Sequence, residues 1–148
     1  MQHKLLNDGG GLRTFAVVLQ TGDEAMECLR RFAREARLEA AQITGIGAFE
    51  KVVLRYFDWG DREYLDNPVD EQVEVASLVG DVALAPDGVP SVHVHLVVGK
   101  RDGSAMAGHL GSGHVRPTLE LIITETPAHL RKVHDPDSGL ALIRLDAG

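Results

Sequence analysis

Cysteine is nearly absent from this sequence, since Cys28 is the single one among 148 residues. One sulfur atom excludes an intrachain disulfide framework, and it excludes a metal cage built from several thiolates. Cys28 also falls inside a predicted helix. A chain without disulfides fits a reducing compartment, and we expect a cytoplasmic location.

Long apolar runs are also missing. The first one, residues 14–19, is far shorter than the roughly 20 residues that a membrane-spanning helix needs. No small-residue cleavage pattern follows it, as would be expected after a secretory signal. We therefore expect no association with a membrane.

Basic residues are outnumbered, with 15 lysines and arginines against 22 aspartates and glutamates, and the net charge is -7. Nucleic-acid binding depends on clustered positive charge that contacts phosphate, so this balance opposes it. Four arginines do gather between positions 30 and 37. They alternate with glutamates along a predicted helix, which indicates a solvated face with intrahelical ion pairs.

The composition that remains is that of a globular protein, with 44% hydrophobic and 25% charged residues. No linker, repeat or low-complexity tract divides the chain. Its length lies within the usual range for one domain. We expect a single domain over residues 1–148, in which residues 1–12, including the glycines at positions 9–11, form a flexible lead-in.

One helix and several strands are predicted. Thr21 with Glu24 three residues later forms a capping box, and apolar residues then recur at helical spacing, so the main helix is expected over about residues 22–37. Short β-prone segments, separated mostly by glycine, proline, aspartate or asparagine, occupy the rest. The predicted strands cover residues 14–20, 41–44, 52–57, 73–78, 82–85, 92–98, 118–124, 130–133 and 140–145. The predicted fold class is α+β: a largely antiparallel sheet packed with one main helix, with room for a second short helix in the loops.

Two histidines share one face of a predicted strand. Between Ser91 and Gly99, strand periodicity places valines and a leucine on one side and His93 with His95 on the other. Alternate residues of a strand stand about 7 Å apart at Cα. Their rings can lean together to bind one ion at about 2.0 Å from each nitrogen.

A third histidine follows from the predicted turn. If residues 101–103 form the loop, with Gly103 in the left-handed conformation, Lys100 pairs with Ser104 and His95 lies opposite His109. A two-residue loop would shift the register by one and turn His109 to the other face. A shorter hairpin would leave His114 as the third histidine.

Three imidazoles with an open position are typical of a catalytic or ligand-binding zinc rather than a closed structural one. Imidazole also suits nickel, copper and iron, so the cofactor is predicted to be Zn²⁺ or another divalent transition metal. Glu120 is a catalytic candidate, because a nearby carboxylate can orient a ligand imidazole or act as general base. A structural role for Glu120 is the alternative.

Several short stretches, taken in order, resemble one known family. They are Gly45-Ile46-Gly47-Ala48, Leu78-Val79-Gly80-Asp81, Gly88-Val89-Pro90-Ser91-Val92-His93-Val94-His95, Asp102-Gly103, Gly108-His109-Leu110 and Thr118-Leu119-Glu120. The family is the plant and prokaryote conserved (PPC) domain, which stands alone in bacteria and archaea and is fused to AT-hooks in plant nuclear proteins. The cupins, which also carry a His-x-His strand, fit less well because Gly99 and Lys100 stand where a glutamate is expected.

The resemblance implies an α+β fold on an antiparallel sheet, a homotrimer, and a metal bound by His93, His95 and His109. It does not extend to the plant family's DNA contacts, because the Arg-Gly-Arg-Pro core of the AT-hook is absent. Residues 71–76 also lack the arginine of the matching plant stretch, and Ala107 replaces a common glycine. DNA is therefore not an expected partner.

Three functions follow from these observations. The first is an open-site zinc protein that binds or transforms a small ligand. The alternative is a DNA-associated or protein-interaction regulatory module without catalysis. In a third, the metal is structural and stabilises the trimer near a subunit contact. Whether the chain is an enzyme stays open at this point.

Overall fold

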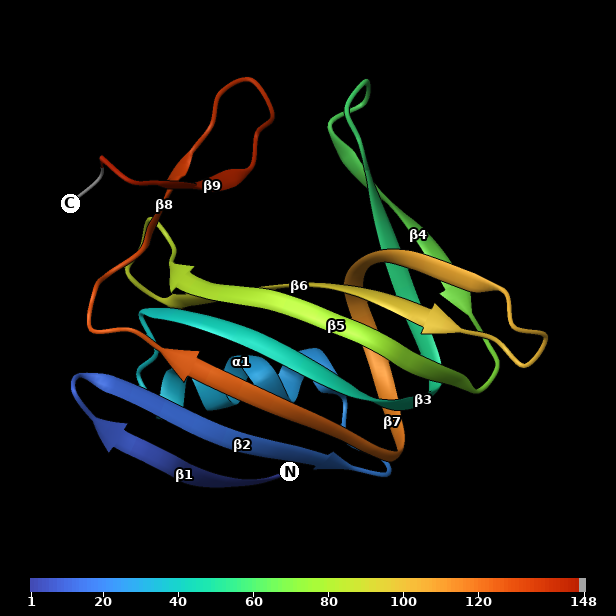
Figure 1. Cartoon of the computed structure of the whole chain (residues 1–148). Coiled ribbons are helices and arrows are strands. Elements are labelled where there is room, and N and C mark those ends of the chain that lie inside the picture. Colours follow the sequence, from blue (N-terminus) through green and yellow to red (C-terminus); the bar gives the residue numbers. More distant parts are fainter. Residues whose placement is uncertain (147–148) are drawn as a thin grey trace.

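The computed structural model describes residues 1–146 as one large, mostly antiparallel sheet with a single helix (Figure 1). Nine strands and the helix follow one another along the chain. They are β1 (Gln2–Gly9), β2 (Leu12–Gln20), α1 (Ala25–Glu35), β3 (Ala40–Asp58), β4 (Glu63–Val69), β5 (Val73–Leu84), β6 (Pro90–Gly99), β7 (Ala105–Glu125), β8 (Arg131–His134) and β9 (Ala141–Arg144).

The predicted α+β class is wrong, because the described chain is predominantly β and α1 has only 11 residues. No second helix occurs within residues 1–146. Segments expected to be short strands separated by glycine loops are fused into β3 and β7, of 19 and 21 residues. The physical reason is that several of these glycines permit close strand packing: a Cβ at Gly47 would lie 2.3 Å from the carbonyl oxygen of Thr118.

The helix begins later than the capping box predicted. Its N-cap is Glu24, whose carboxylate accepts hydrogen bonds from the backbone N–H groups of Met26 and Glu27. Gly22 has φ of 91°, so the chain turns there instead of entering a helix. The apolar face of α1 is buried on the sheet, and its buried residues are Ala25, Met26, Cys28, Leu29, Phe32 and Ala33.

Residues 2–9, part of the expected flexible lead-in, form strand β1 and pair with β2. Gly10 and Gly11, with φ of 63° and 79°, make the tight turn between the two strands. The glycines that suggested flexibility therefore close a hairpin.

The long strands organise the sheet. β7 pairs with β3 and also with β6, while β5 lies between β3 and β6, so these four strands form a closed circuit of pairing. In Figure 1, α1 lies behind this circuit, and the β8–β9 hairpin and the end of the β3–β4 hairpin both project upward in that view. α1 is too short and too polar to cross a lipid bilayer, and no other helix occurs in residues 1–146.

Candidate metal centre

Strand β6 presents two histidines on the side away from the core. Val94, Leu96 and Val98 are each at most 2% exposed, whereas His93 is half-buried and His95 is exposed. The alternation predicted for this strand is confirmed. The buried residues anchor β6 and leave both imidazoles free of the apolar packing.

The turn after β6 has the predicted geometry. The backbone N–H of Lys100 donates to Ser104 at 2.8 Å, and Gly103 adopts φ of 82°. His95 consequently lies directly opposite His109 in the β6–β7 pairing. The alternative with a two-residue loop is wrong.

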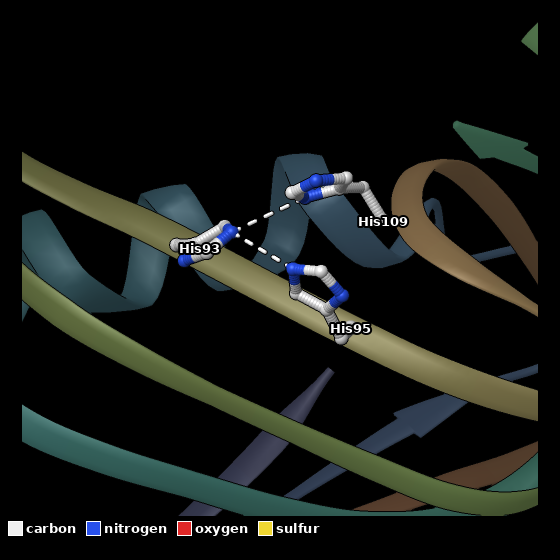
Figure 2. A group of neighbouring side chains, drawn as sticks. All are labelled: His93, His95 and His109. Carbon is white, nitrogen blue, oxygen red and sulfur yellow. Dashed lines mark hydrogen bonds between the residues drawn. The ribbon is translucent and has the colours of Figure 1, made fainter. Parts of the chain in front are cut away.

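Three imidazole nitrogens meet at one point (Figure 2). His93 Nε2 lies 3.1 Å from His109 Nδ1 and 3.1 Å from His95 Nε2. One nitrogen from each residue lies within 4.8 Å of the other two. Nitrogens bound tetrahedrally at about 2.05 Å from a zinc ion are separated by about 3.4 Å, so the set fits a metal with little movement.

Asp81 supports this group of rings and was not singled out from the sequence. Its Oδ2 lies 3.2 Å from His93 Nδ1, the nitrogen on the far side of the ring from the meeting point. A carboxylate in this position fixes the tautomer, because it accepts the Nδ1–H and leaves the Nε2 lone pair toward a metal. The contact with Asp81 therefore orients the His93 ring so that Nε2 can bind a metal at the meeting point.

The signal for Asp81 was present in the β5–β6 hairpin. Ala85 donates its N–H to Val89, and Gly88 has φ of 81°, so this loop has the same geometry as the one after Lys100. Counting back from that pair places Asp81 opposite His93, as the register shows. The counting that located His109 would also have located Asp81.

The charge state of Asp81 is set by opposing influences. Burial alone would raise the pKa of Asp81, but the hydrogen bond with His93 and the charge of Lys132 outweigh burial and hold the pKa below its usual value. The carboxylate is thus ionised at neutral pH. Its Oδ1 is buried without a hydrogen bond, with the Lys132 ammonium 3.5 Å away.

Burial and mutual repulsion keep two of the imidazoles neutral. Burial, followed by the charges of His95 and His93, lowers the pKa of His109 from 6.5 to about 4. Burial and the charge of His93 also lower the pKa of His95. A neutral imidazole has the lone pair that metal binding requires.

Glu120 is not brought together with the histidines. It lies between Val18 of β2 and Ile46 of β3, where Thr118 donates to it at 3.4 Å. It lines a separate cavity over the open face of the sheet. His114, the other candidate ligand, pairs with Lys51 of β3 and lines a different cavity again.

Comparisons with known proteins identify a family and several structures with a similar fold. A family model described as the Plants and Prokaryotes Conserved (PCC) domain matches residues 6–127. The structure of a plant- and prokaryote-conserved (PPC) protein from Pyrococcus horikoshii is similar with a TM-score of 0.83 and 28% identity, over 97% of this chain and 94% of that one. The structure of a metal-containing protein from Archaeoglobus fulgidus is similar with a TM-score of 0.82 and 28% identity, over 97% and 96% of the two chains.

A curated relative is much longer than this chain. The bifunctional protein GlmU of Synechococcus sp. (strain JA-3-3Ab) is 31% identical over 137 residues, which are 92% of this chain. The chain spans 21% of the length of that protein. The likeness therefore concerns only one part of the longer protein.

Proposed function

The chain belongs to the Plants and Prokaryotes Conserved (PCC) domain family, and on that premise we propose that it is a metal-binding domain that uses His93, His95 and His109 as ligands for Zn²⁺ or another divalent transition metal. The observation that carries the proposal is the convergence of one nitrogen from each ring, within 4.8 Å of the others. Without a shared ion, the single lone pair of His93 Nε2 has to accept from both neighbouring nitrogens, His95 Nε2 and His109 Nδ1. A metal gives each lone pair a partner.

The surroundings of the rings support the same proposal. His93 carries the hydrogen bond to Asp81 that metal-binding histidines usually make through their second nitrogen. His109 is neutral well below pH 7, so no proton has to leave it before a metal binds. The related protein of Archaeoglobus fulgidus is described as metal-containing.

We further propose that the site is open and takes a small ligand. No carboxylate or thiolate completes the group formed by the three histidines in the described residues, and His95 is exposed to solvent. A zinc ion held by three protein ligands would act as a Lewis acid, which can polarise a carbonyl group or lower the pKa of a bound water. The net charge of -7 gives no support to the nucleic-acid alternative.

The test is the metal content of the protein, purified without chelator and measured by inductively coupled plasma mass spectrometry. We expect close to one zinc per chain after incubation with Zn²⁺, and loss of that zinc in His95→Ala. His114→Ala is the matched control, because His114 lies outside the cluster and should keep the metal. A wild-type chain that takes up no divalent metal would contradict the proposal.

We also propose that the chain forms a homotrimer through the open face of its sheet. Four apolar side chains on β2, β3, β5 and β7 gather there around a cavity, and three of them are 44–62% exposed. They are Val18, Ile46, Val79 and Ile122. Contiguous exposed apolar surface of this kind is typical of protein interfaces.

A further inference from the structure

A third cavity, distinct from those lined by Glu120 and His114, adjoins the histidines. It has a volume of about 450 Å³, within the usual range for small-molecule sites. His93 and His109 line one side of it. Its other lining residues come from several strands and are mostly apolar: Phe57, Tyr64, Val92, Leu140, Leu142 and Ile143 among them.

The C-terminal hairpin forms one wall of this cavity. β8 and β9 lie beyond residue 127, where the match to the family model ends. The hairpin is fixed beside β5 by the Leu84 N–H, which donates to the carbonyl of Leu130 at 2.7 Å, and by the pairing of Leu84 with Arg131. Lys132, Leu142 and Ile143 are thereby held next to the histidine cluster.

Lys132 is a buried cation with spare donors. Only 7% of its side chain is exposed, and its Nζ lies 3.5 Å from Asp81 Oδ1 and 3.4 Å from Ser91 Oγ. Both contacts are longer than a good hydrogen bond, and an ammonium group has three protons to donate. The ion pair with Asp81 compensates the charge of Lys132, but at these distances the ammonium still has protons to donate to an additional acceptor.

The charges around the cavity favour an anion. Asp81 and Lys132 balance each other, and the three histidines are neutral ligands, so a bound divalent metal leaves the site positive. Among the described residues that line the cavity, Lys132 is the only lysine or arginine. One ammonium and apolar walls suit a monoanion with a hydrophobic body better than a multiply charged phosphate, which usually recruits several cations.

We propose that this cavity binds a small carboxylate with an apolar body, whose carboxylate lies between the metal and Lys132 while its body contacts the wall formed by β9. This inference rests on the proposed metal site and names the class of ligand for it. It assigns Lys132 and the β8–β9 hairpin to ligand selection rather than to metal binding.

The experiment uses the zinc-loaded full chain and compares benzoate with benzamide, its uncharged counterpart, by isothermal titration calorimetry. We expect benzoate to bind and benzamide to bind at least about tenfold more weakly, since a hydrogen bond to a charged group has that effect. Lys132→Met should weaken benzoate about tenfold or more in protein that is held zinc-loaded by excess Zn²⁺, since Lys132 contacts Asp81 but none of the three histidine ligands. Lys51→Met, which alters a lysine at a different cavity, should leave benzoate binding and zinc content unchanged.

A second variant covers the case in which Lys132→Met does not fold. Leu142→Asp places a carboxylate in the cavity wall at a residue that is 39% exposed, and it should weaken benzoate while zinc stays bound. Equal affinities for benzoate and benzamide, or benzoate affinities unaffected by both variants, would overturn the inference. Zinc content, measured in parallel, separates this result from failure of the metal site itself.

Discussion

At the scale of single residues, the proposed metal site includes a supporting side chain that is not one of the three ligands. Asp81 lies across the strand pair from His93 and holds its ring through Nδ1. Removal of this contact leaves three potential ligands but frees one ring to rotate. Affinity for the metal then decreases because the ring must be ordered when the ion binds.

We predict that Asp81→Asn weakens zinc binding by about 10 to 100-fold, the usual cost of losing such a supporting contact. The measurement is competition for zinc against a chromophoric chelator. Asp66→Asn is the control, because Asp66 pairs with Arg55 in an exposed ion pair outside the cluster. Equal zinc affinities in wild type and Asp81→Asn would show that the hydrogen bond to His93 does not orient a ligand.

A second residue-scale prediction concerns pH and the metal-free protein. The pKa of His109 is about 4 in the folded chain against 6.5 for an ordinary histidine, so between these values the unfolded chain binds a proton that the folded chain does not. Lowering the pH through this window therefore stabilises the unfolded state, and the free energy of unfolding should decrease.

Urea unfolding of chelator-treated protein at several pH values between 4 and 7.5 measures this dependence. His109→Gln should unfold with a shallower pH dependence in the same window, because it removes the histidine whose pKa is lowered by folding. The explanation fails if His109→Gln and wild type show the same dependence.

At the scale of elements, the pairing of strands joined by a short hairpin loop could be predicted from the sequence of that loop. The loop of residues 101–103 was assigned from Asp102-Gly103, and this assignment gave the correct pairing of His95 with His109. The same turn chemistry at Asp87-Gly88 sets the β5–β6 register. Local turn geometry fixes the pairing of adjacent strands, so most of the candidate site could be derived from the sequence.

Pairings between distant segments could not be derived in that way. β3 and β7 are separated by β4, β5 and β6, and three register shifts interrupt their ladder. Their length and partners depend on packing over the whole sheet, which leaves no local sequence signal. For this reason the sequence led to an α+β prediction, although the described chain is predominantly β. The position of Glu120 could not be inferred either.

Gly80 links the register of β5 to the position of His93. A Cβ at Gly80 would lie 2.4 Å from the carbonyl oxygen of His93, which is backbone and cannot rotate away. We predict that Gly80→Ala forces β6 from β5, lowers the free energy of unfolding by about 1–3 kcal/mol and weakens zinc binding. Thermal unfolding and the chelator competition measure the two effects.

Gly99→Ala is the matched control for this prediction. Gly99 lies on the same strand as His93, but a Cβ there would be 4.0 Å from the nearest atom, the carbonyl oxygen of Glu74. It should retain stability and metal affinity close to wild type. Equal behaviour of the two alanine variants would show that β5 and β6 tolerate separation at the site.

At the scale of the whole molecule, the open face of the sheet and the metal centre are continuous. Ile122 pairs with Thr44, Thr44 pairs with Val79, and Val79 pairs with His95. Directly paired residues share a face of the sheet. A second copy of the chain seated on the apolar part of this face would therefore lie near the histidines, and assembly and metal binding can be compared in one experiment.

We predict that Ile46→Glu, which places a charge at a residue 62% exposed on this face, disperses the trimer. Burial of an unpaired carboxylate in an apolar interface is costly, so the variant should elute as a single chain of 16.0 kDa while wild type has three times that mass. Size-exclusion chromatography with light scattering measures both masses.

Leu145→Glu is the control. Leu145 is 89% exposed and distant in sequence from the strands of this face, so this variant should remain trimeric. If chelation alone disperses wild type in the same way, the metal has the structural role at the subunit contact; if wild type elutes as a single chain with zinc bound, the trimer proposal is wrong and the histidine site functions within one chain.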